Sequence, residues 1–183
     1  MKIIVAMTGA SGTLFGVEFL KRFEGEKYLV ASRWAKSVLA QETGETLEGL
    51  APHARRVFSN DDLSSPLASG SNHFDAMVIV PCSASTLSKI ACGFADSLIT
   101  RAAAVALKER RKLILCLRET PLSSVVIENM LKLSQAGAIV MPISPSFYQK
   151  AETAADQARL FAERIGQLIE PGAPVTGWKE GWL

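Results

Sequence analysis

The chain has few cysteines, almost no net charge and no long apolar run. Its 183 residues contain three cysteines, Cys82, Cys92 and Cys116, whose spacing matches no metal site, so we expect no bound metal. An odd number of thiols on apolar segments indicates buried cysteines in a reducing compartment, and the chain opens on a strand pattern, so we expect a cytoplasmic protein. A net charge of +2 favours neither nucleic acid nor a membrane surface, and the apolar runs are too short to span a bilayer.

The motifs of two enzyme classes are also missing. Gly9, Gly12 and Gly16 approximate a dinucleotide-binding loop, and Ser32-Arg33 imitates a 2′-phosphate site, but the spacing is not G-x-G-x-x-G. There is no Tyr-x-x-x-Lys pair and no room for a separate substrate domain. The Asp-Asp-x-x-Asp motif of prenyl-diphosphate enzymes is missing too, because Asp61-Asp62 does not belong to one. These absences disfavour a dinucleotide dehydrogenase, whereas a flavin mononucleotide needs one phosphate cradle and one crevice.

What the chain does contain is a regular alternation of strand and helix patterns. Continuous apolar runs predict strands at Ile3–Met7, Tyr28–Ala31, Ala76–Val80, Leu113–Leu117 and Ala138–Met141. Helix patterns lie at Thr13–Phe23, Ala35–Thr43, Ser85–Ile90, Ser97–Arg110, Pro121–Ala136 and Thr153–Ile169. We therefore expect an α/β fold with three layers, a Rossmann-like or flavodoxin-like parallel sheet with helices on both faces. Residues 1–183 form one flavin-binding domain in this interpretation, with an irregular stretch at Glu45–Phe74 and an irregular tail from about Pro171.

Polar residues follow the predicted strands, at the edge where parallel sheets bind ligands. The first strand runs into the glycine turn Thr8-Gly9-Ala10-Ser11-Gly12, and the N–H groups of the helix that follows suit a phosphate. Ser32 after the second strand is, on its own, better explained as an N-cap than as a flavin or ribose ligand. The third strand ends at Pro81-Cys82-Ser83-Ala84-Ser85-Thr86, which has more hydroxyls than a cap needs. Arg118 follows the fourth strand and Tyr148 ends a proline-stiffened loop after the fifth.

Together these segments resemble the UbiX-like flavin prenyltransferases, relatives of the flavin-binding cysteine decarboxylases. Besides the two loops just named, the resemblance rests on Leu98-Ile99-Thr100-Arg101-Ala102-Ala103, Leu107-Lys108-Glu109-Arg110-Arg111, Arg118-Glu119-Thr120-Pro121 and Asn129-Met130-Leu131. It runs from Lys2 to about Ile169. It implies an enzyme that transfers the dimethylallyl group of dimethylallyl phosphate to N5 and C6 of reduced FMN without a metal. The product, prenylated FMN, would serve a UbiD-like decarboxylase.

The resemblance also implies roles for individual residues. FMN would be bound by Gly9, Ala10, Ser11, Ser32, Ser83, Ala84, Ser85, Thr86 and Arg118. The prenyl phosphate would be held by Tyr148 and Arg164, with Lys108 and Arg101 as helpers. Glu42 and Glu119 would handle protons, with Ser11 as a further catalytic residue, and Trp34, Trp178 or Trp182 would offer an aromatic face. Without the resemblance, Glu42, Lys108 and Arg164 would be interpreted as solvated helix-surface charges.

Two other functions and two open questions remain at this stage. An FMN-dependent decarboxylase of cysteine-containing substrates would use a catalytic histidine, but His53 and His73 lie in irregular segments. A flavin-storing carrier would not need Tyr148 and Arg164. The resemblance implies a large closed homo-oligomer, possibly a dodecamer, while the apolar face of the first helix is compatible with an interface or with an ordinary core. Whether the prenyl donor is a mono- or a diphosphate is also open.

Overall fold

The protein folds around one parallel sheet, as its apolar segments predict. The structure is a computed structural model that describes residues 1–171. Its six strands lie in the order β3-β2-β1-β4-β5-β6, and all neighbouring strands are parallel. They are β1 (Lys2–Met7), β2 (Glu26–Ala31), β3 (Arg56–Ser59), β4 (Ala76–Cys82), β5 (Lys112–Leu117) and β6 (Ile139–Val140). The strand order reverses between β1 and β4, which is where sheets of this type open a ligand crevice.

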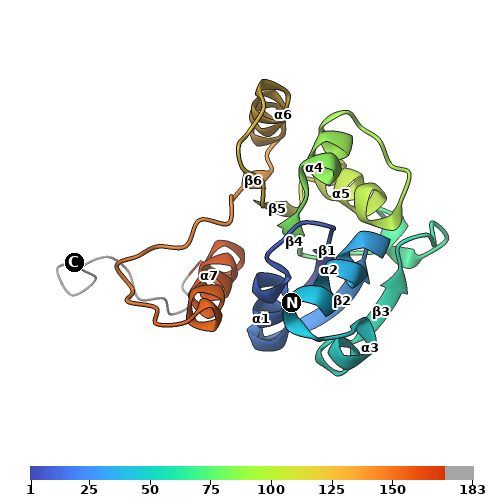
Figure 1. Ribbon diagram of the computed structural model, residues 1–183. Coiled ribbons are helices and arrows are strands. Elements are labelled where there is room, and N and C mark those ends of the chain that lie inside the picture. The colour runs from blue at the N-terminus through green and yellow to red at the C-terminus, as the bar shows by residue number, and fades with distance from the viewer. Residues whose placement is uncertain (172–183) are drawn as a thin grey trace.

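Helices cover both faces of the sheet, which confirms the predicted three-layer α/β fold (Figure 1). One face is covered by α1 (Thr13–Arg22), α2 (Arg33–Thr43), α3 (Leu47–Leu50) and α7 (Ala154–Ile169). The other is covered by α4 (Ala84–Ala91), α5 (Leu98–Lys108) and α6 (Ser124–Gln135). Short 3-10 turns lie at Ala51–His53 and Pro66–Ala68. Because both faces of the central strands are buried, their sequences are continuously apolar rather than alternating.

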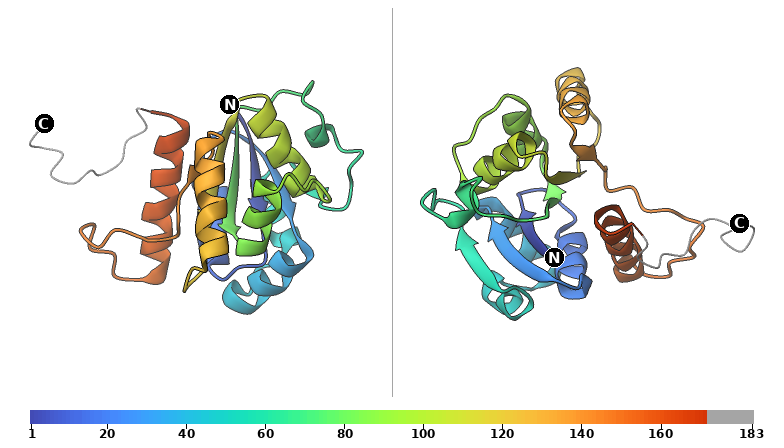
Figure 2. Two further views of the ribbon diagram at one scale, coloured as in Figure 1. Left: turned by 90° about the horizontal axis from the view of Figure 1, so that it is seen from above. Right: turned by 180° about the vertical axis from the view of Figure 1, so that it is seen from behind.

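The last helix returns to pack beside the first (Figures 1 and 2). In Figure 2 the connection after β6 runs out from the sheet before α7 begins. The rings of Phe15 and Phe161 meet edge to face, with centroids 5.3 Å apart, and Phe19 and Leu20 are buried. The apolar face of α1 is therefore filled within the chain, and it belongs to the core rather than to a subunit interface.

The stretch predicted to be irregular, residues 45–74, contains β3 and α3, so that expectation is wrong in part. β3 is a four-residue edge strand whose Phe58 alone is buried, and so short a segment carries little apolar signal. It pairs with β2 from Tyr28 opposite Arg56 to Ala31 opposite Ser59. The pairing of β3 extends the sheet beyond β2 and carries the chain to the crevice edge.

Three smaller expectations also need correction. Helix α6 begins at Ser124 instead of Pro121, because the Ser123 hydroxyl accepts the N–H of Val126 and caps the helix there. The predicted strand at residues 138–141 is shortened to Ile139–Val140. Two of the three thiols are buried as expected, but Cys92 ends α4 on the outside of the molecule.

Candidate active site

Loops from neighbouring strands enclose a cavity at the carboxyl edge of the sheet. It has a volume of about 450 Å³ and lies where the strand order reverses. Its walls come from the ends of β1, β2, β3 and β4 and from the starts of α4 and α5: Thr8, Gly9, Ser32, Arg33, Trp34, Asn60, Asp61, Ser83, Ser85, Thr86, Lys89, Ser97, Ile99 and Thr100. Half of these residues carry a hydroxyl group, which suits a polar ligand that carries a phosphate.

Three glycines shape the β1–α1 turn and the first part of α1, each for a different steric reason. A Cβ on Gly9 would lie 2.4 Å from the Cβ of Trp34, so the turn packs directly against α2. Gly12 has a φ of +94°, the left-handed conformation that favours glycine. A Cβ on Gly16 would lie 2.3 Å from the carbonyl oxygen of Val80, so this glycine lets α1 approach β4 closely. Their spacing thus follows from the packing of this turn.

Thr8 joins the two loops that form the centre of the cavity. Its buried hydroxyl donates to the carbonyl of Pro81 at 3.0 Å and accepts the N–H of Ser83 at 2.8 Å. The N–H of Thr8 also donates to the Pro81 carbonyl, at 3.1 Å. These bonds cross from the end of β1 to the end of β4, so the two predicted FMN loops have a fixed relative position.

Three helix N-termini face the cavity, those of α2, α4 and α5, and serines cap all of them; Ser97 caps α5. The Ser32 hydroxyl accepts the N–H of Ala35 at 3.1 Å, so Ser32 is the N-cap of α2 and also lines the cavity. Ser83 caps α4 by accepting the N–H of Thr86 at 3.2 Å. Lys89, one turn further along α4, lines the same wall and pairs with Asp96 at 2.6 Å. The ends of α2 and α4, with Lys89 beside them, place positive potential where a phosphate would enter.

The N-terminus of α1, which the sequence also predicts as a phosphate site, is occupied by Glu42. Its carboxylate accepts the N–H groups of Gly12 and Thr13, each at 2.9 Å, and the Thr13 hydroxyl at 2.7 Å. Burial on its own raises the pKa of Glu42, but the hydrogen bonds from Ser11, Thr13 and Gly12 outweigh it and lower the pKa overall. A carboxylate held in this way leaves no room for a second anion on the same donors, so the phosphate expectation for α1 is replaced by an internal carboxylate.

Arg118 and Glu119, which follow β5, lie in different surroundings. The N–H of Arg118 donates to the Cys82 carbonyl at 3.0 Å, and its side chain passes the β1–α1 turn, with Cγ 3.9 Å from the position of a Cβ on Gly12. Arg118 therefore borders the same turn as Glu42. Glu119 is exposed and accepts the N–H of Thr120 at 3.1 Å, so it bonds within its own loop.

The predicted pair Tyr148 and Arg164 comes together in a second cavity. This cavity, of about 270 Å³, lies between the loop after β6 and α7. The loop reaches the β1–α1 turn, because Ile143 Cδ1 is 3.6 Å from the position of a Cβ on Gly12. Arg164 also donates to Gln167 on α7. Gly9 of the β1–α1 turn lines the first cavity, and the loop that lines the second packs against Gly12 of the same turn, where Glu42 binds.

Arg101 and Lys108 do not join that second cavity within one chain. Both lie on α5, on the opposite face of the sheet from α7. Arg101 Nε donates to the carbonyl of Ala68 at 2.9 Å, and Lys108 pairs with Glu109. Lys108 ends α5 just before β5 begins, which places it at the amino edge of the sheet, away from the crevice.

Sequence reasoning missed several residues that line the first cavity, including Asn60, Lys89, Ser97 and Thr100. Asn60 follows β3, and its side-chain oxygen and carbonyl accept the N–H groups of Ile99 and Leu98 at 3.0 and 2.7 Å. It therefore fixes the start of α5 against the crevice. The signal for Asn60 is its place after a strand, which was hidden because β3 itself was not predicted.

Other candidates lie away from the crevice. His73 is exposed and pairs with Asp75 at 3.0 Å, and neither His73 nor His53 lines either cavity described above. Within residues 1–171 no group of three or more His, Cys, Asp or Glu side chains could hold a metal ion, and no helix is long and apolar enough to cross a membrane. Trp34 borders the crevice, whereas Trp178 and Trp182 lie outside the described residues.

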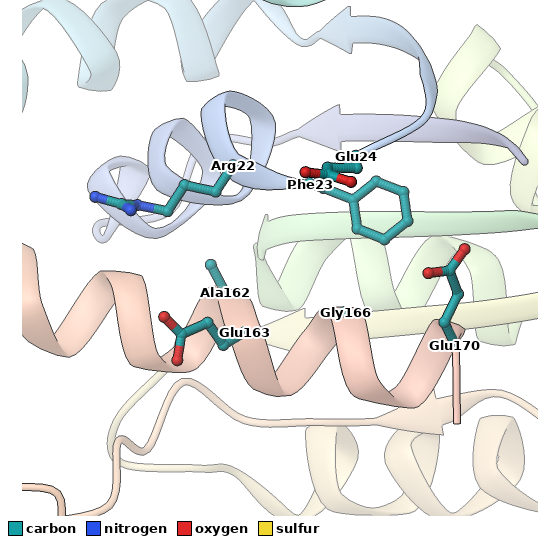
Figure 3. Close-up of a pocket in the computed structure, with 7 residues that line it drawn as sticks. All are labelled: Arg22, Phe23, Glu24, Ala162, Glu163, Gly166 and Glu170. Carbon is teal, nitrogen blue, oxygen red and sulfur yellow. The ribbon is translucent and has the colours of Figure 1, made fainter. Parts of the chain in front are cut away.

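A further cavity separates the end of α1 from α7 (Figure 3). Phe23 and Glu24 face Gly166 and Glu170 there, and the volume is about 370 Å³. α1 ends where β2 is about to begin, so this cavity lies at the amino edge of the sheet. It contains none of the predicted site residues, so it is not the candidate active site.

Known proteins are similar to this chain in both sequence and fold. The family model described as Flavoprotein matches residues 1–169. The flavin prenyltransferase UbiX of Thermoplasma acidophilum is 48% identical over 173 residues, which cover 94% of this chain and 96% of that protein. A structure of AnUbiX (PadA1) with FMN and dimethylallyl pyrophosphate superposes with a TM-score of 0.92 at 40% identity, covering 97% of this chain and 98% of that one. A dodecameric FMN-dependent UbiX-like decarboxylase from Escherichia coli O157:H7 gives a TM-score of 0.93 at 39% identity, covering 98% and 100%. The chain belongs to the Flavoprotein family, in its group of UbiX-like flavin prenyltransferases.

Proposed function

We propose that the protein transfers the dimethylallyl group of dimethylallyl phosphate to N5 and C6 of reduced FMN, giving prenylated FMN. The observation that carries this proposal is that one turn borders a first cavity and also contacts the loop that lines a second. The first is lined by hydroxyls and helix N-termini, the second by Tyr148 and Arg164, and the turn that both approach is capped by Glu42. A protein that only stored a flavin would have no use for the second cavity.

FMN would occupy the first cavity, where hydroxyls and helix N-termini line the walls. The phosphate would lie at the N-termini of α2 and α4, near Ser32 and the segment Ser83–Thr86, because the donors of α1 are held by Glu42. The turn residues Gly9, Ala10 and Ser11 and the Arg118 side chain would then border the ring system. The reduced flavin supplies the nucleophilic atoms of the reaction, and the protein residues supply orientation and charge.

The second cavity would hold the phosphate of the prenyl donor. When the bond between the allylic carbon and the phosphate oxygen breaks, negative charge grows on the leaving phosphate. The Arg164 guanidinium and the Tyr148 hydroxyl would stabilise that charge by donating hydrogen bonds to it. Trp34 offers an aromatic face at the wall of the first cavity for the cationic character of the prenyl group.

Glu42 would accept the proton that leaves C6 when the second bond forms, between C6 and the prenyl group, whose double bond takes up a proton in the same ring closure. Its lowered pKa keeps it ionised near neutral pH, which is the state that an acceptor needs. Ser11, which donates to Glu42, would help to hold it. Glu119 bonds within its own loop, which makes it the second choice for this role.

The site would be completed by a second copy of the chain. Lys108 lies at the opposite edge of the sheet from the crevice, and Arg101 on the opposite face from α7, so a neighbouring subunit would have to bring them to Tyr148 and Arg164. Helix α6 offers large exposed apolar side chains, Val125, Ile127 and Leu131, for such contacts. We therefore expect a closed homo-oligomer, and the dodecameric relative suggests its size.

The alternative, an FMN-dependent decarboxylase of cysteine-containing substrates, has weaker support. Such an enzyme would use a histidine, and neither histidine of this chain borders the crevice. We further predict that the product is delivered to a UbiD-like decarboxylase. Cytoplasmic placement also stays a prediction, favoured by the three free thiols.

Anaerobic incubation with reduced FMN and dimethylallyl phosphate, followed by mass analysis of the released flavin, tests the proposal. We expect the mass of FMN plus one five-carbon prenyl unit. Parallel reactions with the monophosphate and the diphosphate identify the donor, and oxidised FMN serves as the control. Recovery of unmodified FMN from every reaction would refute the proposal, and loss of carbon dioxide from a peptide with a C-terminal cysteine would support the alternative.

A further inference from the structure

The two carboxylate oxygens of Glu42 accept different numbers of hydrogen bonds from the start of α1. Oε2 accepts three hydrogen bonds, from the N–H of Gly12, the N–H of Thr13 and the hydroxyl of Thr13, at 2.9, 2.9 and 2.7 Å. Oε1 lies at a longer 3.1 Å from the Gly12 N–H. A carboxylate oxygen has two lone pairs, so the acceptor capacity of Oε2 is fully used. The Ser11 hydroxyl also donates to this carboxylate, but Oε1 lacks the contacts with Thr13, so it is the oxygen held less firmly by α1 and more open to a proton.

We propose that Thr13 is a positioning residue: it holds Oε2 of Glu42 at the N-terminus of α1, so that Oε1 accepts the proton during prenylation. This inference rests on the proposed function. Thr13 is the first residue of α1 and is completely buried, so water does not compete for its hydroxyl. Its branched side chain has few rotamers, which keeps the hydroxyl aimed at Glu42. The shortest of the bonds to Oε2 comes from this hydroxyl.

The same contact sets the pH range in which Glu42 can accept a proton. Burial raises the pKa of Glu42, and hydrogen bonds from Ser11, Thr13 and Gly12 lower it by more. Arg118, whose side chain passes Gly12, is a charged residue beside this turn, and the pair Lys21–Glu45 links α1 to the segment after α2 at 2.6 Å. Neither is changed by a substitution at Thr13. Removing the hydroxyl therefore raises the pKa of Glu42, and the ionised form appears only at higher pH.

Thr13→Val and Thr13→Ala remove the hydroxyl, the first with the branched shape retained and the second without risk of a steric clash. Thr13→Ser retains the hydroxyl and serves as the rescue. Thr46→Val is the matched control, because Thr46 caps α3 by accepting the Gly49 N–H and makes no bond to Glu42. The rate of prenylated FMN formation is measured anaerobically against pH for all four variants, together with KM for dimethylallyl phosphate.

In Thr13→Val and Thr13→Ala we expect the rate of prenylated FMN formation to fall about tenfold at acid pH and to recover as the pH rises, as a pKa raised by about one unit would produce. The KM for dimethylallyl phosphate should be unchanged. This loss in rate is smaller than the roughly 10²- to 10⁴-fold loss expected when an acid–base group is removed altogether. Thr13→Ser and Thr46→Val should keep the wild-type profile. A wild-type profile in both variants that lack the hydroxyl would overturn the inference.

A second measurement keeps this inference separate from the proposed function. Infrared titration of the FMN-free protein follows the Glu42 carboxyl band, which Glu42→Gln identifies by its loss. In Thr13→Val and Thr13→Ala the band should titrate at higher pH than in wild type. If wild type makes no prenylated FMN, the proposed function fails, while the titration still tests the contact between Thr13 and Glu42. An unchanged titration would overturn the positioning role.

Discussion

Substituting Gly9 tests how closely the FMN loop packs against α2. A Cβ on Gly9 would lie 2.4 Å from Trp34 Cβ, 3.4 Å from Trp34 Cγ and 3.5 Å from the Trp34 carbonyl carbon. Ordinary carbon contacts are about 3.5–4.0 Å, so Gly9→Ala needs a shift of about 1 Å. The Trp34 Cβ cannot move alone, because it is bonded to the backbone of a helix held by buried Ala35 and Leu39.

We expect Gly9→Ala to lower the free energy of unfolding by about 1–3 kcal/mol, the usual range for overpacking. FMN affinity should also fall, by about tenfold, because the turn and Ser32 line the same cavity and a shift of either widens it. Thermal melts at fixed protein concentration measure the first effect, and quenching of FMN fluorescence on binding measures the second.

Two substitutions at Trp34 separate the Cβ contact from the indole. Trp34→Gly removes the clashing Cβ at a cost of about 1 kcal/mol for glycine in a helix, and it should rescue Gly9→Ala in the double variant. Trp34→Ala retains the Cβ and should give no rescue. A Gly9→Ala protein as stable as wild type, or additive effects in the Gly9→Ala/Trp34→Gly pair, would refute the reasoning.

Four further predictions concern the second cavity, the oligomer and Glu42. Tyr148→Phe and Arg164→Ala should leave the affinity for FMN nearly unchanged. Each should weaken the affinity for dimethylallyl phosphate by about ten- to hundredfold, because each removes a hydrogen bond to a charged group. Calorimetry on the FMN complex measures both affinities, and an equal loss of FMN affinity would contradict the prediction. Lys108→Ala and Arg164→Ala proteins, each impaired alone, should regain part of the activity when unfolded and refolded together, because mixed oligomers contain intact shared sites; activity no greater than the sum of the separate proteins would exclude a shared site. Glu42→Gln should bind FMN and dimethylallyl phosphate but form the four-ring product about 10²- to 10⁴-fold more slowly. The pKa of Glu42 is lower in the folded protein than its ordinary value of 4.5, so wild type should be more stable than Glu42→Gln above pH 4.5. This difference in stability should vanish as the pH falls from there through the folded pKa, and thermal melts at a series of pH values measure it.

The order of strands and helices could be predicted from the sequence because the central strands are buried on both faces. A run such as residues 2–7 is then apolar at every position, and helices with one apolar face alternate with such runs. The predicted residues of the FMN loops follow strand ends, and parallel strands bring their carboxyl ends to one edge. The loops Gly9–Ser11 and Ser83–Thr86 were therefore placed together correctly, and the Thr8 bonds show how they are joined.

The edge of the sheet was less predictable. β3 has four residues with one buried side chain, so nothing in its sequence separates it from a loop, and Asn60 at its end was missed with it. The pairing of β3 with β2 depends on backbone bonds that any sequence can make. Only the tertiary contact with β2 makes this segment a strand.

What the sequence by itself determined is the alternation of elements, the hydroxyl-rich strand ends and the family. The tertiary structure alone decided which charges meet. Glu42 lies 30 residues from Gly12 in sequence, and its carboxylate reaches the α1 N-terminus because α1 and α2 pack side by side on one face. Lys108, although its motif marks it as functional, is carried by α5 to the opposite edge of the sheet. Sequence patterns record which side chains are buried, whereas the meeting of two distant polar groups depends on how whole helices are placed on the sheet.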